Sequence, residues 1–234
     1  MNLHSALVDR LVPTVRYIRT YLIEATIEKE RKISEISNAD AEKASIFFDE
    51  LRQLRLNSKI IKKAIEMAAV WPVGGMTTPA RGPVVYVLCR LMKPKTIVET
   101  GVSSGVSSLY ILEALEKNGE GHLYSIDYHC PSDRLPSGWL VPERLHDRWT
   151  MTLAKSSERL KPILEEIDST DIFLHDSDHS HENMMFEFKT AWPHIREGGL
   201  LLSDDTHTNQ SFFDFAREVN RKPTMFYLLG AIRK

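Results

Sequence analysis

The sequence has little cysteine and no long apolar run. Among its 234 residues are two cysteines, Cys89 and Cys130, which are too few for a disulfide framework and form no CxxC pair for zinc. No apolar run approaches the roughly 20 residues of a membrane-spanning helix. The N-terminal stretch lacks the basic segment, clean apolar core and small-residue cleavage site of a secretory signal. These absences predict a reduced, soluble, cytoplasmic protein without a membrane partner.

An excess of positive charge is also absent. The formal net charge is −2, so nothing in the composition indicates a nucleic-acid partner. Hydrophobic residues make up 42% of the chain, which at this length is enough for a full core without disulfides or a structural metal. The length fits one large domain or one domain with an appendage.

The chain divides into a helical first part and an alternating second part. Apolar residues recur at three- and four-residue spacing near the start, and the segment SNADAEKASIFFDELRQL begins with an Asn/Asp helix-start signal. The stretch PVGGMTTPARGP then breaks the pattern and is typical of a hinge. We therefore expect a helical N-terminal extension, residues 1–78, that covers a substrate opening or forms an oligomer contact. The main domain would follow as residues 79–234.

Short apolar runs alternate with helix-like segments in the main domain. The runs are TIVE, GHLYSID, RWTMTLA, DIFLHD and GGLLLSDD. This alternation is typical of an α/β fold with a doubly wound, mostly parallel sheet. The last segment, KPTMFYLLGAIRK, predicts terminal strands, such as a hairpin that turns at Leu229-Gly230. Ligands bind beyond the carboxyl ends of such strands, and the ends here carry acids: Glu99, Asp127, Asp176, Asp204 and Asp205.

The loop after the first strand contains Gly101 and Gly105. Glycine there permits a positive φ and a close approach of the backbone to a ligand. The spacing is G-x-x-x-G rather than the dinucleotide fingerprint G-x-G-x-x-G, and the carboxylate of Glu99 would repel a pyrophosphate. No Lys-Ser/Thr follows Gly105, which excludes a P-loop. The alternative is a tight strand-to-helix turn without a ligand.

Asp127 ends the second strand, 26 residues after Gly101. An acid at this strand end typically accepts hydrogen bonds from ribose hydroxyls, although an aspartate in a turn or helix cap would look the same. Glu99 and Asp127 together favour a nucleoside without phosphates.

Four motifs in this order, VETGVSSGVSSL, YSID, DIFLHDSDHSHENMMFEF and IREGGLLLSDDT, resemble the class I S-adenosylmethionine-dependent methyltransferases. More narrowly, they are similar to the metal-dependent small-molecule O-methyltransferases of the catechol or caffeoyl-CoA type and of the macrolide-sugar (macrocin-like) type. The resemblance covers about residues 80–234. It implies that the loop contacts the methionine part of the cofactor, Asp127 its ribose and Ser156 its adenine, so that the cofactor residues are Glu99, Gly101, Ser103, Gly105, Asp127, Ser156 and Asp176. For Ser156, a helix N-cap is an equally good interpretation.

The stretches HDSDHSH, residues 175–181, and SDDTH, residues 203–207, are dense in acids and histidines. If the two strand ends are neighbours, three carboxylates converge and are unstable without a cation, for which a hard ion such as Mg²⁺ is the natural choice. The resemblance implies that this ion binds Asp176, Asp204 and Asp205. The last pair is Asp-Asp, whereas the catechol type has Asp-Asn and the macrolide-sugar type Glu-Asp.

The histidines of the first stretch allow several interpretations. The resemblance implies that His179 is a general base. Alternatively, Asp178 caps the following helix and leaves His179 and His181 on its solvent face, while His175 is buried and structural. Zinc or non-haem iron could instead bind histidines together with a carboxylate.

The resemblance implies methyl transfer from S-adenosylmethionine to a hydroxyl of a small molecule, assisted by Mg²⁺. Two alternatives remain open: a metal-dependent hydroxylase on the same scaffold, as in cephalosporin-hydroxylase-like relatives, and a non-catalytic nucleoside-binding subunit. The expected partner is a small hydroxylated substrate, and the N-terminal helices could join two copies of the chain. Segment 128–149, rich in Pro, Trp and Arg, predicts a lid or substrate wall, or else a surface excursion with Trp139 and Trp149 in a side cluster.

Overall fold

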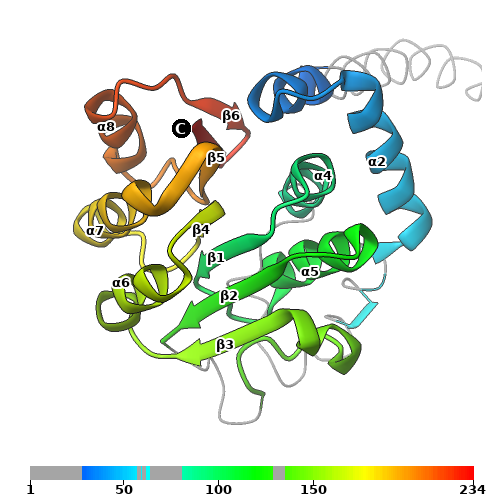
Figure 1. Ribbon diagram of the computed structural model, residues 1–234, viewed down its shortest axis with the longest axis horizontal. Coiled ribbons are helices and arrows are strands. Elements are labelled where there is room, and N and C mark those ends of the chain that lie inside the picture. The colour runs from blue at the N-terminus through cyan, green and yellow to red at the C-terminus, as the bar shows by residue number, and fades with distance from the viewer. Residues whose placement is uncertain (1–27, 57–58, 60–61, 64–80, 129–134) are drawn as a thin grey trace, which may run out of the picture.

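A computed structural model of the chain describes residues 28–56, 59, 62–63, 81–128 and 135–234 (Figure 1). Three predictions fall wholly or partly outside these residues: the helices before residue 28, the hinge with the domain boundary at residue 78, and part of the lid, residues 129–134. Cys130 also lies outside them, whereas Cys89 is a buried free thiol.

One sheet of seven strands forms the centre of the described part of the chain. The strands are β1 (Thr96–Thr100), β2 (His122–Asp127), β3 (Trp149–Leu153), β4 (Thr170–His175), β5 (Ile195–Ser203), β6 (Thr224–Phe226) and β7 (Leu229–Arg233). Their order in the sheet is β3-β2-β1-β4-β5-β7-β6. The strands β1 to β5 pair in parallel, and β7 pairs antiparallel with β5 and β6. The predicted α/β fold with a doubly wound, mostly parallel sheet is therefore confirmed.

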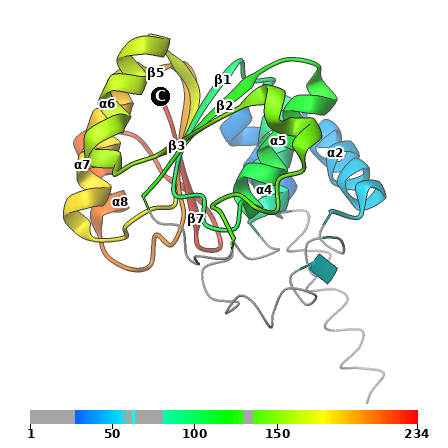
Figure 2. The ribbon, with the colours of Figure 1, turned by 90° about the horizontal axis from the view of Figure 1, so that it is seen from below.

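Helices cover both faces of the sheet (Figure 2). One face carries α2 (Ala41–Leu54), α4 (Gly82–Met92) and α5 (Val106–Asn118), and the other α6 (Ser156–Ile167), α7 (His181–Ala191) and α8 (Ser211–Glu218). The short 3₁₀ helices are η1 (Glu143–Arg148) and η2 (Trp192–His194). None of the described helices combines the length and the apolar composition needed to cross a bilayer.

Alternating side chains of each central strand supply the two cores. In β1, Ile97 belongs to the core that contains α4 and α5, whereas Val98 belongs to the core that contains α6, α7 and α8. In β4, Ile172 and Phe173 divide in the same way. Both faces of these strands are thus buried, which explains why the strands read as continuous apolar runs in the sequence.

Residues 28–56 pack onto the main domain, and α2 lies beside α4 (Figure 1). The helix α2 begins after Asp40, whose side chain accepts a hydrogen bond from the N–H of Glu42 at 2.9 Å, as the start signal predicts. Phe48 and Leu51 of α2 are buried in the core that contains α4 and α5. The role of the extension as a substrate cover or an oligomer contact stays a prediction.

The predicted C-terminal hairpin is present, but its turn does not lie at Leu229-Gly230. The strands β6 and β7 are joined by Tyr227 and Leu228, and Tyr227 has the positive φ of 63°. Gly230 lies within β7, where a Cβ would come within 2.4 Å of the ring of Phe212. This glycine therefore allows close packing, and the turn is made elsewhere.

Candidate active site

Backbone hydrogen bonds continue beyond the strand ends and bring the following loops together. The N–H groups of Gly101, Asp176 and Asp204 each donate, at 2.8 Å, to a carbonyl near the end of a neighbouring strand. Because β2, β1, β4 and β5 are adjacent in this order, the residues after them form a row at one edge of the sheet. The acidic stretches after β4 and β5 are thus neighbours, which is the condition for their carboxylates to converge.

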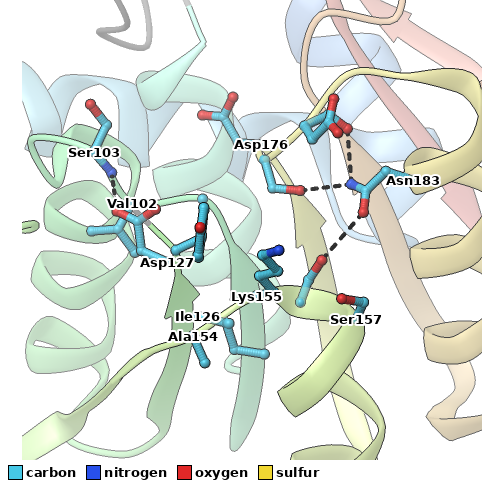
Figure 3. A pocket seen from close by; sticks show the side chains of 14 residues that line it. Val102, Ser103, Ile126, Asp127, Ala154, Lys155, Ser157, Asp176 and Asn183 are labelled. Carbon is cyan, nitrogen blue, oxygen red and sulfur yellow. Dashed lines mark hydrogen bonds between the residues drawn. The ribbon is translucent and has the colours of Figure 1, made fainter. Parts of the chain in front are cut away.

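A cavity of about 650 Å³ lies at this edge of the sheet (Figure 3). Its volume is in the range of small-molecule sites, roughly 300–1,000 Å³. Figure 3 shows Asp127 and Ser103 on one side, Asn183 on the other, and Asp176 and Lys155 between them. Five of the predicted cofactor residues line the cavity: Gly101, Ser103, Asp127, Ser156 and Asp176.

Close contacts with neighbouring backbone shape the glycine loop. Gly101 has a φ of 85°, and a Cβ there would lie 1.9 Å from the carbonyl oxygen of Asp176. Gly105 has a φ of 87° and precedes α5, and a Cβ there would lie 2.8 Å from Cα of Gly138. Both positions therefore require glycine. The contact partner of Gly105 is the segment around Gly138, whereas Gly101 itself lies on the cavity wall.

The described half of the predicted lid, residues 135–149, packs against the glycine loop. The N–H of Gly138 donates to the carbonyl of Ser103 at 2.8 Å. Trp139 and Trp149 are half-buried against the core that contains α4 and α5. For this half, the geometry agrees with the alternative interpretation, in which the tryptophans form a side cluster.

Glu99 is fully buried beneath the loop. Its carboxylate accepts hydrogen bonds from the hydroxyls of Ser108 at 2.6 Å and Ser125 at 2.9 Å. Burial raises the pKa of Glu99, and the charge of Asp127 adds to the rise, although hydrogen bonds from the serines oppose it. Glu99 thus ties α5 to β2, and it is not one of the described residues that line the cavity. Its contact with the methionine part of a cofactor stays a prediction.

Asp127 and Ser156 lie on the wall of the cavity. Oδ2 of Asp127 accepts a hydrogen bond from the N–H of Ser103 at 2.9 Å. Ser156 is the first residue of α6, and Lys155 holds the N-cap position. The interpretation of Ser156 as an N-cap is therefore wrong, because Ser156 is already within the helix. The hydroxyl of Ser156 instead donates to Oδ1 of Asn183 at 3.4 Å.

A buried arginine lies within the acidic cluster. Arg81 directly precedes α4, and 7% of its surface is exposed. Its Nη1 forms ion pairs with Asp204 and, at 2.9 Å, with Asp205. Burial lowers the pKa of Arg81, but the hydrogen bond and charge of Asp204 and the charges of Asp205 and Asp176 outweigh burial and raise it. The guanidinium is therefore permanently charged and held by two carboxylates.

This ion-pair cluster does not fit the predicted magnesium site at Asp176, Asp204 and Asp205. One oxygen of each carboxylate, Oδ2 of Asp204 and Oδ1 of Asp205, contacts the guanidinium of Arg81 instead of a metal ion. Within the described ranges of the chain, no group of three or more His, Cys, Asp or Glu side chains is arranged to hold a metal ion. The sequence predicts correctly that these carboxylates need a cation, and at Asp204 and Asp205 that cation is Arg81.

His179, the predicted general base, lies beside the acidic cluster. Its Nε2 is 3.8 Å from Oδ1 of Asp176, a residue of the cavity wall. Burial lowers the pKa of His179, and His175 lowers it further, whereas the charges of Asp205 and Asp204 oppose the change. The imidazole is therefore neutral near pH 7 and able to accept a proton.

The structure agrees only in part with the alternative interpretation, in which Asp178 caps the following helix and His179 and His181 lie on its solvent face. Ser180 caps α7, because its side chain accepts a hydrogen bond from the N–H of Asn183 at 3.3 Å. Asp178 accepts from the N–H of Ser180 at 2.9 Å, so it stabilises the preceding turn rather than the helix end. His181 is exposed, as that prediction has it, and its Nε2 lies 3.5 Å from Asp214.

Glu187 of α7 is a buried residue that the sequence patterns do not single out. It accepts hydrogen bonds from Nδ1 of His175 at 2.7 Å, from Thr100 at 2.5 Å and from Ser177 at 2.7 Å. Burial raises the pKa of Glu187, but the bond and charge of His175 and the hydroxyl donors outweigh it, and the net change is a lowering. His175 is fully buried, as predicted. A single acid within the apolar segment NMMFEF was the signal that could have indicated Glu187.

Comparison with known proteins gives a family match and several relatives that are similar over a short stretch. Residues 98–206 match a family model described as a methyltransferase domain. A Mycobacterium sp. (strain KMS) protein, named as a candidate O-methyltransferase, is 38% identical over 58 residues, or 25% of this chain and 24% of the relative. A Mycobacterium sp. (strain JLS) protein of the same name is 36% identical over the same length. The chain thus spans about a quarter of the length of the curated relatives it matches.

Solved structures with the same fold are distant in sequence. The S-adenosylhomocysteine-bound methyltransferase PaMTH1 of Podospora anserina has a TM-score of 0.58 at 15% identity, over 74% of this chain and 86% of its own. The O-methyltransferase TomG of Streptomyces achromogenes has a TM-score of 0.56 at 16% identity, over 74% and 88%. An O-methyltransferase of Bacillus cereus has a TM-score of 0.55 at 16% identity, over 91% and 100%. The fold and the family match over residues 98–206 therefore confirm the resemblance to class I S-adenosylmethionine-dependent methyltransferases.

Proposed function

We propose that this chain transfers a methyl group from S-adenosylmethionine to a hydroxyl of a small molecule. The observation that carries the proposal is the cavity, which has Asp127 on its wall at the strand end where an acid accepts hydrogen bonds from ribose hydroxyls. The similar structures support it, because PaMTH1 and the Bacillus cereus protein contain S-adenosylhomocysteine and TomG contains S-adenosylmethionine. Methylation at oxygen follows the names of TomG and of the curated relatives.

The residues of the cavity fit a nucleoside that carries a charged amino-acid tail. Asp127 offers a carboxylate to the ribose hydroxyls, and the loop of Gly101 and Ser103 brings backbone close to the tail. Lys155 and Tyr128 also line the cavity, with Nζ 5.0 Å from the centre of the tyrosine ring. S-adenosylmethionine, when bound, supplies an electrophilic methyl group on a sulfonium.

In this proposal His179 accepts the proton of the acceptor hydroxyl. Its lowered pKa keeps the imidazole neutral and ready to act as a base. Asp176, 3.8 Å from Nε2, stabilises the imidazolium that forms. Glu187 binds His175, whose ring packs edge-on against that of His179 with the centroids 5.2 Å apart. The buried pair thereby restricts the orientation of the base, and catalysis depends mainly on positioning.

Calorimetry with S-adenosylhomocysteine tests the cofactor site. Asp127→Asn should weaken binding by roughly 10- to 150-fold, because a hydrogen bond to a charged group contributes about 1.5–3 kcal/mol. His179→Asn should bind nearly as the wild type does but lose methyl transfer. The exposed Asp147 provides a matched control, since Asp147→Asn makes the same change away from the cavity. No binding by the wild type would contradict the cofactor assignment, and unchanged binding by Asp127→Asn would contradict the role of Asp127.

No specific observation favours the two alternatives, a metal-dependent hydroxylase or a non-catalytic nucleoside-binding subunit. Methyl transfer from labelled S-adenosylmethionine to a set of hydroxylated small molecules would separate the proposal from both. Product formation that needs oxygen and a reductant would favour the hydroxylase. Cofactor binding without turnover on any acceptor would favour the subunit, for which the extension before residue 79 is the proposed oligomer contact.

A further inference from the structure

The cation in the acidic cluster is part of the chain itself. The side chains of Arg81 and Asp204 are 8% and 5% exposed, and that of Asp205 is 31% exposed. Arg81 approaches the strand ends from the start of α4, so its position is set by the packing of that helix on the sheet. The charge of Asp176 acts on the same guanidinium. One permanent positive charge therefore lies among the three carboxylates that the sequence assigns to magnesium.

The contacts of the guanidinium compete directly with metal ligation. Nη1 of Arg81 contacts Oδ2 of Asp204 and Oδ1 of Asp205, which are oxygens that a bound Mg²⁺ would need. To reach them, a metal ion would have to displace a buried, hydrogen-bonded charge that cannot lose its proton. The displaced guanidinium would then need new partners.

We propose that Arg81 takes the place of the divalent metal ion that the acidic strand ends predict, so that this site works with a fixed side-chain cation. Two buried atoms of the cluster, Nε of Arg81 and Oδ1 of Asp204, have no hydrogen-bond partner among the described residues. Buried polar atoms without a partner call for an explanation, such as an ordered water or a catalytic role. That the site catalyses a reaction without a metal ion rests on the proposed function.

Thermal unfolding with MgCl₂ or MnCl₂, against NaCl at matched ionic strength, tests the proposal without any activity assay. The unfolding midpoint of the wild type should be the same in all three salts. The midpoint of Arg81→Lys should likewise not change from one salt to another. Arg81→Met removes the charge but keeps most of the side-chain volume, so Asp204 and Asp205 lose their cation. With small shifts of their side chains they can then bind a metal ion together with Asp176. The midpoint of Arg81→Met should rise by about 3–6 °C when the metal is tenfold above its dissociation constant.

Two further variants make the metal response specific. Arg81→Met combined with Asp204→Asn should lose the response, because it removes a ligand together with the cation. Arg217→Met, a matched change at an exposed arginine, should behave as the wild type does. If Arg81→Met does not fold alone, refolding that is rescued by Mg²⁺ supports the proposal, and refolding that is equally poor with and without Mg²⁺ overturns it. The proposal would also be overturned if Mg²⁺ raises the midpoint of the wild type but does not raise that of Asp204→Asn.

Methyl transfer provides an independent second test. The wild-type rate should be unchanged by EDTA and by added Mg²⁺. Loss of the rate in EDTA with recovery in Mg²⁺ would refute the replacement of the metal by Arg81. Absence of methyl transfer under all conditions would instead count against the proposed function, and the unfolding experiment would still decide the role of Arg81.

Discussion

The substitution Gly101→Ala tests the contact that joins the glycine loop to the end of β4. Gly101 has a φ of 85°, and its added Cβ would lie 1.9 Å from the carbonyl oxygen of Asp176. Gly119, at the end of α5, has a similar φ of 76°, but an added Cβ there would meet nothing within 4 Å. The two alanine variants therefore share the backbone strain and differ in the contact.

The expected loss of stability follows from these two effects. The left-handed backbone conformation costs an ordinary residue about 1–2 kcal/mol, and Gly119→Ala should lose only this amount. At Gly101 the carbonyl of Asp176 must also move, although the N–H of Asp176 is held by a hydrogen bond to Thr100 at 2.8 Å. Such overpacking costs a further 1–3 kcal/mol or so. Gly101→Ala should therefore lose about 2–5 kcal/mol, or roughly 4–20 °C in unfolding temperature for a chain of this size.

Urea unfolding of both variants measures the difference, and calorimetry with S-adenosylhomocysteine measures its consequence at the cavity. Gly119→Ala should bind as the wild type does, whereas Gly101→Ala should bind more weakly, because Gly101 and Asp176 both line the cavity. Equal losses of stability in the two variants would refute the reasoning, since the contact with Asp176 would then contribute nothing.

Two buried carboxylates give opposite predictions for pH. Glu187 has a lowered pKa, so its ionised form stabilises the fold above the unfolded value of about 4.3, and this contribution is lost as the pH falls through the lower folded value. Glu187→Gln should lower the unfolding temperature by several degrees at pH 7 and lessen the decline on the acid side; an unchanged profile would contradict the network with His175 and Thr100. Glu99 has a raised pKa, so its contribution is present below about pH 4.3 and is lost as the pH rises through the folded value. Glu99→Gln should keep or raise the unfolding temperature at pH 8, and a large fall in that temperature would show that the charge of Glu99 is needed. If this variant binds S-adenosylhomocysteine more weakly at unchanged stability, the predicted contact of Glu99 with the cofactor is supported.

The fold could be predicted because its main signals are local. Each central strand is buried on both faces, so it appears as a short apolar run, and an acid or glycine follows where the chain leaves the sheet. The hairpin turn was misplaced because Gly230 has a packing role against Phe212, and a glycine in a sequence does not reveal which role it has. Tyr227 makes the turn instead, with a positive φ that its residue type does not suggest.

The cavity wall could be predicted in outline from one rule, that ligands bind beyond the carboxyl ends of parallel strands. The rule selects the strand ends, and Asp127 and Asp176 do line the cavity. It does not say which way a side chain at a strand end points. Glu99 alternates with Val98 along β1 and faces the serines of α5 and β2, which only the packed sheet reveals. Glu187 was missed for a similar reason, since its partners lie at the ends of two strands, Thr100 on β1 and His175 and Ser177 at the end of β4 and just after it.

Arg81 shows what an electrostatic argument from sequence can and cannot decide. The density of acids after β4 and β5 requires a compensating charge, and that inference does not depend on knowing the fold. The identity of the compensating charge does depend on the fold, because Arg81 lies 123 residues before Asp204. The prolines and glycines around Arg81 suggest only a hinge. A magnesium ion and a guanidinium meet the same need for positive charge, and both bind two carboxylates well. An acidic cluster in a sequence therefore predicts a positive charge rather than specifically a metal ion. Any arginine or lysine of the chain could supply this charge, and only the fold shows which one does.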